Sequence, residues 1–287
     1  MPVRGPILGE VVRAATAIAA YGPVPLIFAN SAALYLLDNW LWHAAATGMR
    51  QALLLALDEA AAARAGDPHC RVVRLTFDGT LSELWQVRLL VFEVLAAAGI
   101  DVVHSDLDAV WLDDPRPHLF DDALLDGAFS QGTFHPRAAH AAWQFVLCCG
   151  LFGLRGSPAT ARFMAAVRGQ AVQDGDDQAA LNHVLLHTGT AWEADDSSET
   201  YQIGDERLRF ACRRRMLRGR NSRLGLRIGL LPFHRVPRLV LPTAFTAEPA
   251  IVCHPHSLRG EAGRIAALRA AGVWRDDAAS ARYARIP

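Results

Sequence analysis

The chain has 287 residues, of which 52% are hydrophobic and 20% are charged, and its formal net charge is zero. This length allows a full buried core, and the neutral charge argues against a nucleic-acid-binding protein, which usually carries a basic surface. All 29 basic residues are arginine, so any mechanism that requires a lysine is excluded.

The cysteines and the N-terminal segment bear on the cellular compartment. There are five cysteines, none in a C-x-x-C pair, and an odd number argues against a secreted disulfide framework. No segment has the length and apolar character of a membrane span, and Glu10 and Arg13 interrupt the apolar start as they would not in a signal peptide. We therefore expect a cytoplasmic protein without a transmembrane segment.

The first hundred residues alternate between strand-like and helix-like segments. Apolar runs predict strands at 24–29, 50–57, 71–75 and 100–105, with helical patterns between them, including 31–48 and 80–99. The helix at 80–99 begins with a capping box formed by Thr80 and Glu83 and ends at Gly99. This order predicts an α/β fold with a mainly parallel central sheet and helices on both faces.

The rest of the chain is less regular. Apolar runs predict strands at 127–132 and 145–155, and helical patterns lie at 157–170, 176–187 and 260–274. No internal repeat and no Pro/Ser-rich linker interrupts the sequence. We predict one domain, 1–287, with unequal halves at 1–113 and 114–287.

Polar residues follow three of the predicted strands. Asn30, Asp58 and Asp106 each stand at the carboxyl end of a strand. In open α/β sheets, ligands bind in the crevice at that edge. Three such residues in succession therefore predict a polar crevice.

The stretch VVHSDLDAVWLDDP (102–115) ends a hydrophobic strand on two aspartates, Asp106 and Asp108. Side chains alternate along a strand, so we expect both carboxylates on one face. Two like charges this close repel each other unless a cation lies between them, and hard divalent cations prefer oxygen ligands. The motif is short, and an acidic turn without a ligand is the simpler alternative.

One enzyme class with such a motif is the haloacid dehalogenase type of phosphatase. The segment DLDAV (106–110) matches its D-x-D-x-[TV] motif, in which Asp106 would be the nucleophile of a Mg²⁺-dependent reaction. In those enzymes the motif usually lies near the start of the chain and is combined with a lysine, sometimes an arginine. Here the motif lies a third of the way along a chain that has no lysine.

The chain more closely resembles the nucleotide-diphospho-sugar glycosyltransferases of GT-A fold, in particular glycosyltransferase family 77, which includes plant xylosyl- and arabinosyltransferases. The resemblance runs from about residue 26 to 275 and is most specific in D-x-D-x-x-W-x-x-x-P (106–115) and in IVCHPHSLRG (251–260). It implies a Rossmann-like sheet with a smaller acceptor-side region. The half 1–113 would bind the nucleotide, and 114–287 would hold the acceptor and a C-terminal metal-binding segment.

The resemblance also implies a cofactor and its ligands. In such enzymes the D-x-D motif holds Mn²⁺ or Mg²⁺ against the diphosphate of a UDP-sugar, where the ion stabilises charge on the leaving group. By analogy Asp108 would ligate the ion, Asp106 would ligate it and also contact the ribose or sugar, and His254 would be the third protein ligand. A histidine before a proline is otherwise more often structural.

Further donor contacts follow from the same resemblance. Asn30 and Asp58 would line the uridine pocket, and Arg88 on the preceding helix would contact the donor. Gly260 and Arg264 would approach the diphosphate, with Arg264 in place of the family's frequent lysine. Arg88 has a simpler alternative, an arginine that extends from an apolar helix to solvent.

The pair Asp177 and Gln178 matches residues that lie near the anomeric carbon in retaining relatives. A covalent route would use one of them as nucleophile, whereas a front-face route would not, and helix capping is the simpler role. Two positions that face the sugar in relatives depart from the family, since Cys148 replaces a common asparagine and Gln131 a frequent acid. The identity of the sugar therefore stays open.

The acceptor is not predicted beyond its general class: a glycan, a peptide, a lipid-linked intermediate or a small molecule. Arginines are concentrated between Arg207 and Arg238, including Arg213, Arg214 and Arg215. Such a run is most often a solvated face, but it would also suit an anionic acceptor or a peripheral contact with an acidic membrane. A catalytically inactive nucleotide-sugar binder is a further alternative to the transferase.

Overall fold

The computed structural model describes residues 5–75, 77–195, 199–203, 208–238, 249–256 and 260–275, and leaves the side chains of 65, 199–203 and 208–211 undescribed. The strands, in chain order, are β1 (Val24–Ala29), β2 (Ala52–Ala56), β3 (Cys70–Arg74), β4 (Val102–Ser105), β5 (Val110–Trp111), β6 (Gly127–Gln131), β7 (Leu147–Leu154), β8 (Ala191–Trp192), β9 (Glu199–Ile203), β10 (Leu208–Cys212), β11 (Leu217–Asn221), β12 (Leu226–Leu230) and β13 (Val252–Cys253).

The helices alternate with these strands. The α-helices are α1 (Gly5–Ala19), α2 (Leu34–Ala46), α3 (Glu59–Ala62), α4 (Leu81–Ala97), α5 (Pro115–Phe120), α6 (Arg137–Trp143), α7 (Pro158–Asp174), α8 (Asp177–His187) and α9 (Glu261–Ala270). Three short 3-10 turns are η1 (Ser31–Ala33), η2 (Ala63–Gly66) and η3 (Phe233–Arg235). Among the described helices, none combines the length and apolar character that crossing a bilayer requires.

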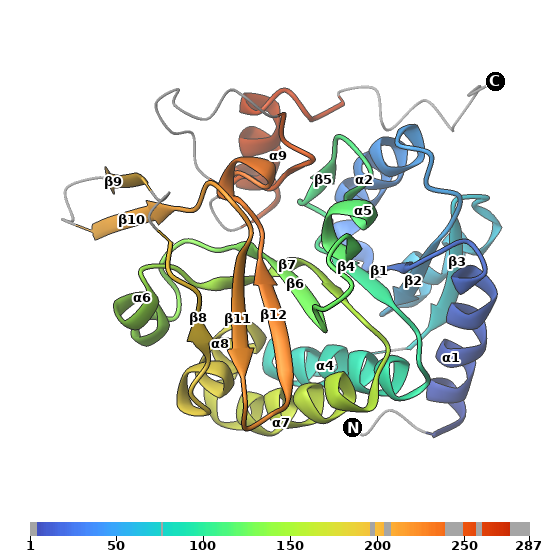
Figure 1. Cartoon of the computed structure of the whole chain (residues 1–287). Helices are drawn as coiled ribbons and strands as arrows, with labels where there is room; N and C mark the ends of the chain where they lie inside the picture. Colours follow the sequence, from blue (N-terminus) through green and yellow to red (C-terminus); the bar gives the residue numbers. More distant parts are fainter. Residues whose placement is uncertain are drawn as a thin grey trace.

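Nine of the described strands form one sheet in the order β3-β2-β1-β4-β7-β6-β12-β11-β8 (Figure 1). The strands β3, β2, β1 and β4 pair in parallel, whereas β7 runs antiparallel to both β4 and β6. The α/β prediction is confirmed, and the sheet is mixed rather than uniformly parallel. Strands from both 1–113 and 114–287 belong to this one sheet, so no break in the sheet marks the expected division, which stays a prediction.

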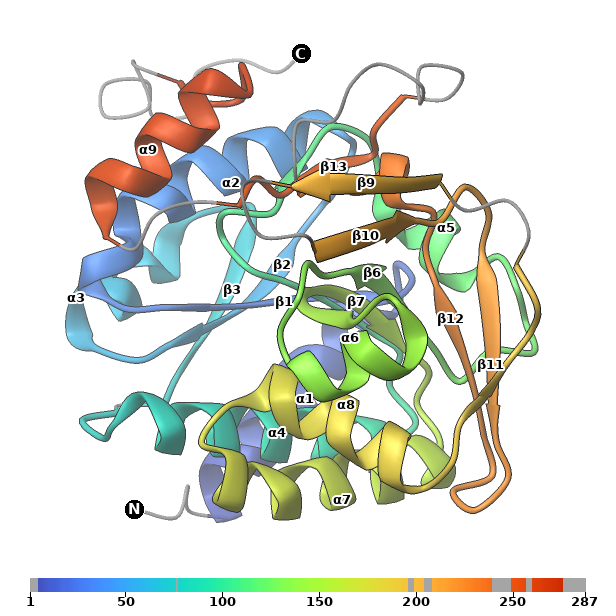
Figure 2. The same cartoon turned by 90° about the vertical axis from the view of Figure 1, so that its left-hand side faces the viewer.

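Both faces of the sheet are buried, which explains the unbroken apolar runs in the strands. On β1, Leu26 packs in a core cluster with residues of α1, α4, α7 and α8, while its neighbour Ile27 packs in a second cluster with residues of α2 and α9. Figure 2 shows α4, α7 and α8 on one side of the sheet and α2 and α9 on the other. The predicted helices on both faces are confirmed.

One local feature differs from the sequence-based expectation. The strand β4 ends at Ser105, so Asp106 and Asp108 lie in the turn that follows and not on one face of a strand. The N-terminal apolar stretch forms α1, which buries Val11 and Ile18 against the sheet. The capping box of α4 is present as predicted, with both reciprocal hydrogen bonds between Thr80 and Glu83.

Candidate active site

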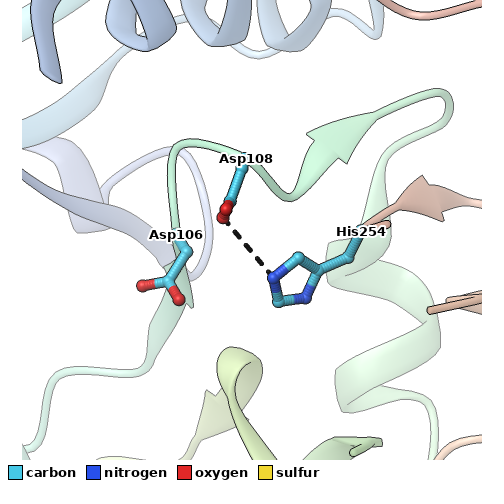
Figure 3. Close-up of side chains that lie close together, drawn as sticks. All are labelled: Asp106, Asp108 and His254. Atoms are coloured by element: carbon cyan, nitrogen blue, oxygen red, sulfur yellow. Dashed lines mark ion pairs between the residues drawn. The ribbon is translucent and has the colours of Figure 1, made fainter. Parts of the chain in front are cut away.

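The two aspartates lie on a tight turn at the carboxyl edge of the sheet. The Asp106 N–H donates to the carbonyl of Gly150 on β7 at 2.7 Å, and the Ala109 N–H donates to the carbonyl of Asp106 at 3.0 Å. The chain therefore turns back between Asp106 and Ala109. The turn brings the side chain of Asp108 to the same region as that of Asp106 (Figure 3).

The buried hydroxyl of Ser105 and the indoles of two tryptophans pack against the start of this turn. The Ser105 Oγ accepts hydrogen bonds from Trp40 Nε1 at 3.0 Å and from Trp111 Nε1 at 3.2 Å. The two indole rings pack edge to face, with centroids 5.2 Å apart, and are fully buried. Since buried aromatic N–H groups need partners, the tryptophans and the serine fix one another, and with them the start of the turn.

His254 reaches the turn through strand pairing. The strand β13 pairs antiparallel with β5, with Cys253 opposite Val110, so the next residue lies beside the aspartates. His254 Nε2 is 3.4 Å from Asp108 Oδ1 (Figure 3). Asp106, Asp108 and His254 each offer a ligand atom within 4.8 Å of the others. The structure thus brings together the three residues expected as ligands; their binding of a cation stays a prediction.

A glycine makes room for these three side chains. A Cβ atom on Gly150 would lie 2.2 Å from His254 Cε1 and 2.9 Å from Asp106 Oδ2. Both distances are far below van der Waals contact, so any side chain at this position must displace a candidate ligand. Position 150 therefore has to be glycine for the cluster to form.

We expect Gly150→Ala to disrupt metal binding more than folding. The added methyl group must push His254 away from Asp108, and overpacking of this kind typically costs about 1–3 kcal/mol of stability. The affinity for Mn²⁺, measured by isothermal titration calorimetry in the presence of UDP, should fall at least roughly 10-fold. Gly169→Ala is the matched control, because a Cβ there meets nothing within 4 Å; an unchanged affinity in Gly150→Ala would contradict the close approach.

A buried guanidinium links the turn to helix α8. Arg88 on α4 is 5% exposed, its Nη1 is 3.4 Å from Asp106 Oδ1 and its Nη2 is 3.4 Å from Asp177 Oδ2. Burial raises the pKa of Asp106, but the Arg88 charge outweighs it and holds that pKa well below its usual value. Arg88 therefore does not extend to solvent, and Asp106 is an ionised carboxylate.

His104 holds this guanidinium in place. Its Nδ1 is 3.0 Å from the carbonyl of Leu26, and its Nε2 is 2.7 Å from Arg88 Nη2. Because an arginine can only donate, Nε2 must be the acceptor, which places the imidazole proton on Nδ1. Burial and the neighbouring Arg88 charge lower the pKa of His104 to about 4, so the ring is neutral at physiological pH.

Asp177 is the second carboxylate on Arg88, and it is 6% exposed at the first turn of α8. Burial raises its pKa to about 6, although the Arg88 charge acts in the opposite direction. An acid with a raised folded-state pKa reduces stability where it is ionised in the folded protein, and this penalty disappears as the pH falls toward its unfolded value. The fold therefore carries a cost for keeping Asp177 charged at neutral pH.

We expect Asp177→Asn to stabilise the protein at pH 8, by about 1–3 kcal/mol, because the amide removes the buried charge. The gain should shrink as the pH falls through 6 and vanish at about pH 3, below the ordinary aspartate pKa of 3.8, where Asp177 is largely protonated in both folded and unfolded states. Urea unfolding of both proteins at the two pH values measures the difference. A gain that does not change with pH would show that the effect is not due to ionisation of Asp177.

A thiol, an imidazole and a second guanidinium meet beside the aspartates. Arg238 Nη1 lies 2.9 Å from Cys148 Sγ, and 3.0 and 3.1 Å from the ring nitrogens of His254. Burial raises the pKa of Cys148, but the charges of Arg238 and His254 outweigh it and lower the pKa to about 7. Burial and Arg238 lower the pKa of His254, but hydrogen bonds with Asp108 and Cys148 raise it to about 9.

Two cavities meet at Asp106 and Asp108. The first, about 260 Å³, is lined by aromatic and aliphatic side chains that include Phe28 and Trp85. The second, about 220 Å³, is mainly polar and is lined by residues of α8 and β7 and by Arg238 and His254. An apolar, ring-lined cavity suits a nucleobase and a polar cavity suits a sugar, with the candidate metal ligands between them.

The residues expected around the nucleotide lie close together but not all in the first cavity. Asn30 lines it, between β1 and η1. Asp58 is not among the residues that line it; its carboxylate accepts from the N–H groups of Ser31 at 2.6 Å and Ala61 at 2.9 Å. These bonds hold the N-termini of η1 and α3, so the structure gives Asp58 a capping role and leaves its contact with uridine a prediction.

The two residues expected near the diphosphate belong to the start of α9. Arg264 lines the first cavity, and its Nε is 3.8 Å from Asp108 Oδ2. Gly260 precedes the helix with a φ of 93°, a left-handed conformation that favours glycine, and it does not line either cavity. Gly260 therefore sets the direction of α9, and Arg264 is the side chain that faces the site.

Gln178 lines the second cavity, but both ends of its amide are engaged. Its Oε1 accepts from the Cys149 N–H at 3.3 Å, and its Nε2 donates to the carbonyl of His135 at 2.7 Å. Asp176, one residue before α8, caps the helix by accepting from the Ala179 N–H at 2.7 Å. The capping role considered for Asp177 and Gln178 thus belongs to Asp176, while Asp177 and Gln178 both line the cavity.

The arginine-rich segment is not one uniform solvated face, and Arg207 lies outside the described residues. Arg213 is 8% exposed and pairs with Asp195 at 3.1 Å. Arg220 and Arg227 are exposed and lie directly opposite each other on β11 and β12. The interpretation of the segment as an acceptor or membrane contact stays a prediction.

Sequence reasoning missed three contributors to the site: Trp85, His104 and the placement of Arg238. Arg88 lies 4.6 Å from the ring of Trp85. Trp85 stands one helical turn before Arg88, so helical spacing was a usable signal. Nothing in the sequence indicated that Arg238, at the end of the arginine-rich run, would reach Cys148.

Comparison with known families identifies the class of protein that has this geometry. The family model described as nucleotide-diphospho-sugar transferase matches residues 47–250, which is most of the chain. The chain belongs to the nucleotide-diphospho-sugar transferase family. It is a glycosyltransferase that uses a nucleotide-sugar donor, and this membership favours the transferase over the phosphatase alternative.

Solved structures support the fold of this transferase. The galactosyltransferase LgtC, in a complex with donor and acceptor sugar analogues, matches with a TM-score of 0.54 and 15% identity over 92% of this chain and 98% of that one. Mouse xyloside xylosyltransferase 1 matches more weakly, with a TM-score of 0.36 and 13% identity over 57% of this chain and 82% of that one. No curated protein matches the chain. The likeness to LgtC confirms a GT-A-like fold.

Proposed function

We propose that this transferase depends on a divalent metal ion and moves a sugar from a UDP-linked donor to an acceptor hydroxyl with retention of configuration. The observation that carries the proposal is the convergence of Asp106, Asp108 and His254 at the junction of the two cavities. Two carboxylate oxygens and one imidazole nitrogen form a donor set that suits Mn²⁺ or Mg²⁺. The residues present therefore fit the ion that the family resemblance implies.

Different groups of the protein would bind the diphosphate and the uridine. A bound Mn²⁺ or Mg²⁺ supplies Lewis-acid stabilisation of the negative charge on the departing UDP. Arg264, at the first cavity, is placed to donate hydrogen bonds to phosphate oxygens. Asn30 and Trp85 line the same cavity and provide a polar contact and a stacking surface for the uridine.

The sugar lies on the Asp177 side in this proposal. Arg88 pairs with both Asp177 and Asp106 and so fixes the distance between them. The carboxylate of Asp177 then faces the positive charge that develops on the sugar ring. The bond from the anomeric carbon to the UDP oxygen breaks, the bond to the acceptor oxygen forms, and the acceptor proton passes to the released diphosphate. Because the Gln178 amide is already hydrogen-bonded at both ends, Asp177 is the better candidate for a nucleophile if the reaction is covalent.

The finer assignment to glycosyltransferase family 77 belongs to the same proposal and rests on the D-x-D-x-x-W-x-x-x-P block (106–115). The acceptor is a glycan, a peptide, a lipid-linked intermediate or a small molecule that approaches the second cavity. The proposal also includes a cytoplasmic location and a peripheral membrane contact through the arginine-rich segment.

The experiment is incubation of the protein with a panel of UDP-sugars and Mn²⁺, with release of UDP as the readout. We expect slow UDP release with at least one donor and none when EDTA removes the metal. Turnover of p-nitrophenyl phosphate without UDP release would favour the phosphatase alternative. Donor binding without any release of UDP, even with a range of acceptor sugars, would favour an inactive binder.

A further inference from the structure

The second cavity contains two guanidinium groups, and only one of them is paired with carboxylates. Arg88 lies between Asp106 and Asp177. Within the described residues, Arg238 makes no ion pair with a carboxylate, although it lines the same cavity. Its polar side-chain contacts there are the Cys148 thiol and the His254 ring. Among the described residues, Arg238 is therefore a cation without a carboxylate partner in the cavity assigned to the sugar.

The hydrogen-bonding groups of Arg238 are also incompletely used. Its Nε is buried and has no hydrogen-bond partner in the described part of the protein. A buried donor of this kind costs free energy, and more so when it belongs to a charged group. A guanidinium that has spare donors and no carboxylate partner among the described residues has the chemistry of a binding site for an anion.

The contact of Arg238 with His254 does not satisfy a donor of the guanidinium well. One nitrogen, Nη1, lies 3.0 and 3.1 Å from the two ring nitrogens of His254. The lone pairs of an imidazole lie in the ring plane and point in different directions, so a group equally close to both nitrogens faces the ring and is not directed at either lone pair.

The position of Arg238 bears on whether its anionic partner is the sugar or the diphosphate. Arg264 lines only the first cavity and Arg238 lines only the second, and the candidate metal ligands lie between them. The second cavity also contains Asp177 and Gln178, the residues expected near the anomeric carbon. The neighbours of Arg238 in this cavity favour an anion on the sugar, and the comparison with Arg264 below distinguishes it from the diphosphate.

We propose that Arg238 binds a carboxylate of the transferred sugar, so that the donor is a nucleotide-activated uronic acid. A single guanidinium fork matches one carboxylate in charge and in geometry, because it presents parallel N–H donors to the two oxygens. A neutral hexose would leave the cation of Arg238 unpaired in the cavity. This inference rests on the proposed function, since it assumes that the second cavity holds the donor sugar.

The test is calorimetric titration with UDP, UDP-glucose and UDP-glucuronic acid, and with UDP-galactose and UDP-galacturonic acid, all with Mn²⁺ and without an acceptor. We expect each uronic acid to bind roughly 10- to 100-fold more tightly than its neutral counterpart. Arg238→Gln should remove this preference, so that each uronic acid binds no more tightly than its neutral counterpart, whatever the change in the affinity for UDP itself. Arg238→Lys, which keeps the charge without the fork, should retain part of it, and thermal melting verifies that each variant is folded.

The comparison with Arg264→Gln distinguishes the two possible anions. That variant should weaken UDP and every donor to the same extent, as expected for a diphosphate contact. If Arg238→Gln behaves in the same way, or if neutral sugars bind as tightly as uronic acids, the carboxylate assignment is overturned while the transferase stands. If UDP and all donors fail to bind to the wild-type protein, the proposed function is overturned and this inference with it.

Discussion

Asp108→Asn is expected to abolish metal-dependent binding of UDP and with it the release of UDP from donor sugars. Asp108 lies between the proposed ligand that follows β13 and the arginine expected at the diphosphate, since one of its oxygens is 3.4 Å from His254 Nε2 and the other is 3.8 Å from Arg264 Nε. Loss of a residue that only supports a metal ligand typically costs 10- to 100-fold in affinity, so loss of the ligand itself should cost at least about 100-fold. Calorimetry with UDP, with and without Mn²⁺, measures the effect.

The matched control is Asp113→Asn, the same change five residues later on an exposed turn. Within the part of the chain that the structure describes, the Asp113 carboxylate accepts only from the neighbouring Asp114 N–H at 2.8 Å, so its amide variant should bind UDP and Mn²⁺ as the wild type does. His254→Ala should weaken binding through loss of the same cation. Equal binding by Asp108→Asn and Asp113→Asn would mean that the turn does not hold the ion.

Arg88→Met is expected to reduce both activity and stability. Arg88 is the shared counter-charge of Asp106 and Asp177, and removing one partner of a buried charged network typically costs about 3–5 kcal/mol. The rate of UDP release should fall about 10²- to 10³-fold, the usual effect of removing one preorganised electrostatic contact. Chemical denaturation and initial rates with a saturating donor measure the two effects.

Arg168→Met is a suitable control because it breaks an ion pair on the surface. Arg168 Nε is 2.9 Å from Glu93 Oε2, and the Arg168 side chain is 39% exposed. Such pairs contribute about 1 kcal/mol or less, and we expect no change in the rate. If Arg88→Met loses no more stability than Arg168→Met, the buried network does not contribute as the geometry indicates.

Much of the fold follows from local signals in the sequence. The helix α4 begins where Thr80 and Glu83 satisfy each other's backbone groups, and these groups are adjacent in the sequence. The strands β1 and β2 are buried on both faces, so they appear as unbroken apolar runs. The antiparallel direction of β7 has no such signal, because a run of buried apolar residues is expected whether the strand is parallel or antiparallel to its neighbours.

The site was only partly predictable for the same reason. Asp106 and Asp108 follow an obvious strand, but their turn depends on Ser105 and on two indoles, from Trp40 and Trp111, which lie 65 and 6 residues away. His254 was identified through the family resemblance, whereas its position depends on the two-residue pairing of β5 with β13, which is too short to recognise in a sequence.

Long-range polar contacts account for the residues that were missed. His104 lies in an apolar strand, and only the approach of Arg88 from α4 shows that its imidazole accepts a hydrogen bond there. Arg238 is the last residue of an arginine-rich run, and the contact that sets it apart is with Cys148, 90 positions away. Periodicity reports which side of an element is buried, but not which polar groups meet across the core.

The most direct test of the account is a crystal structure of the protein with UDP and Mn²⁺, with the metal located by its anomalous scattering. The account predicts one manganese ion bound by Asp106, Asp108, His254 and the diphosphate, with the uridine in the cavity beside Trp85. A manganese ion elsewhere, or UDP bound with these three side chains making no contact with a metal, would contradict it.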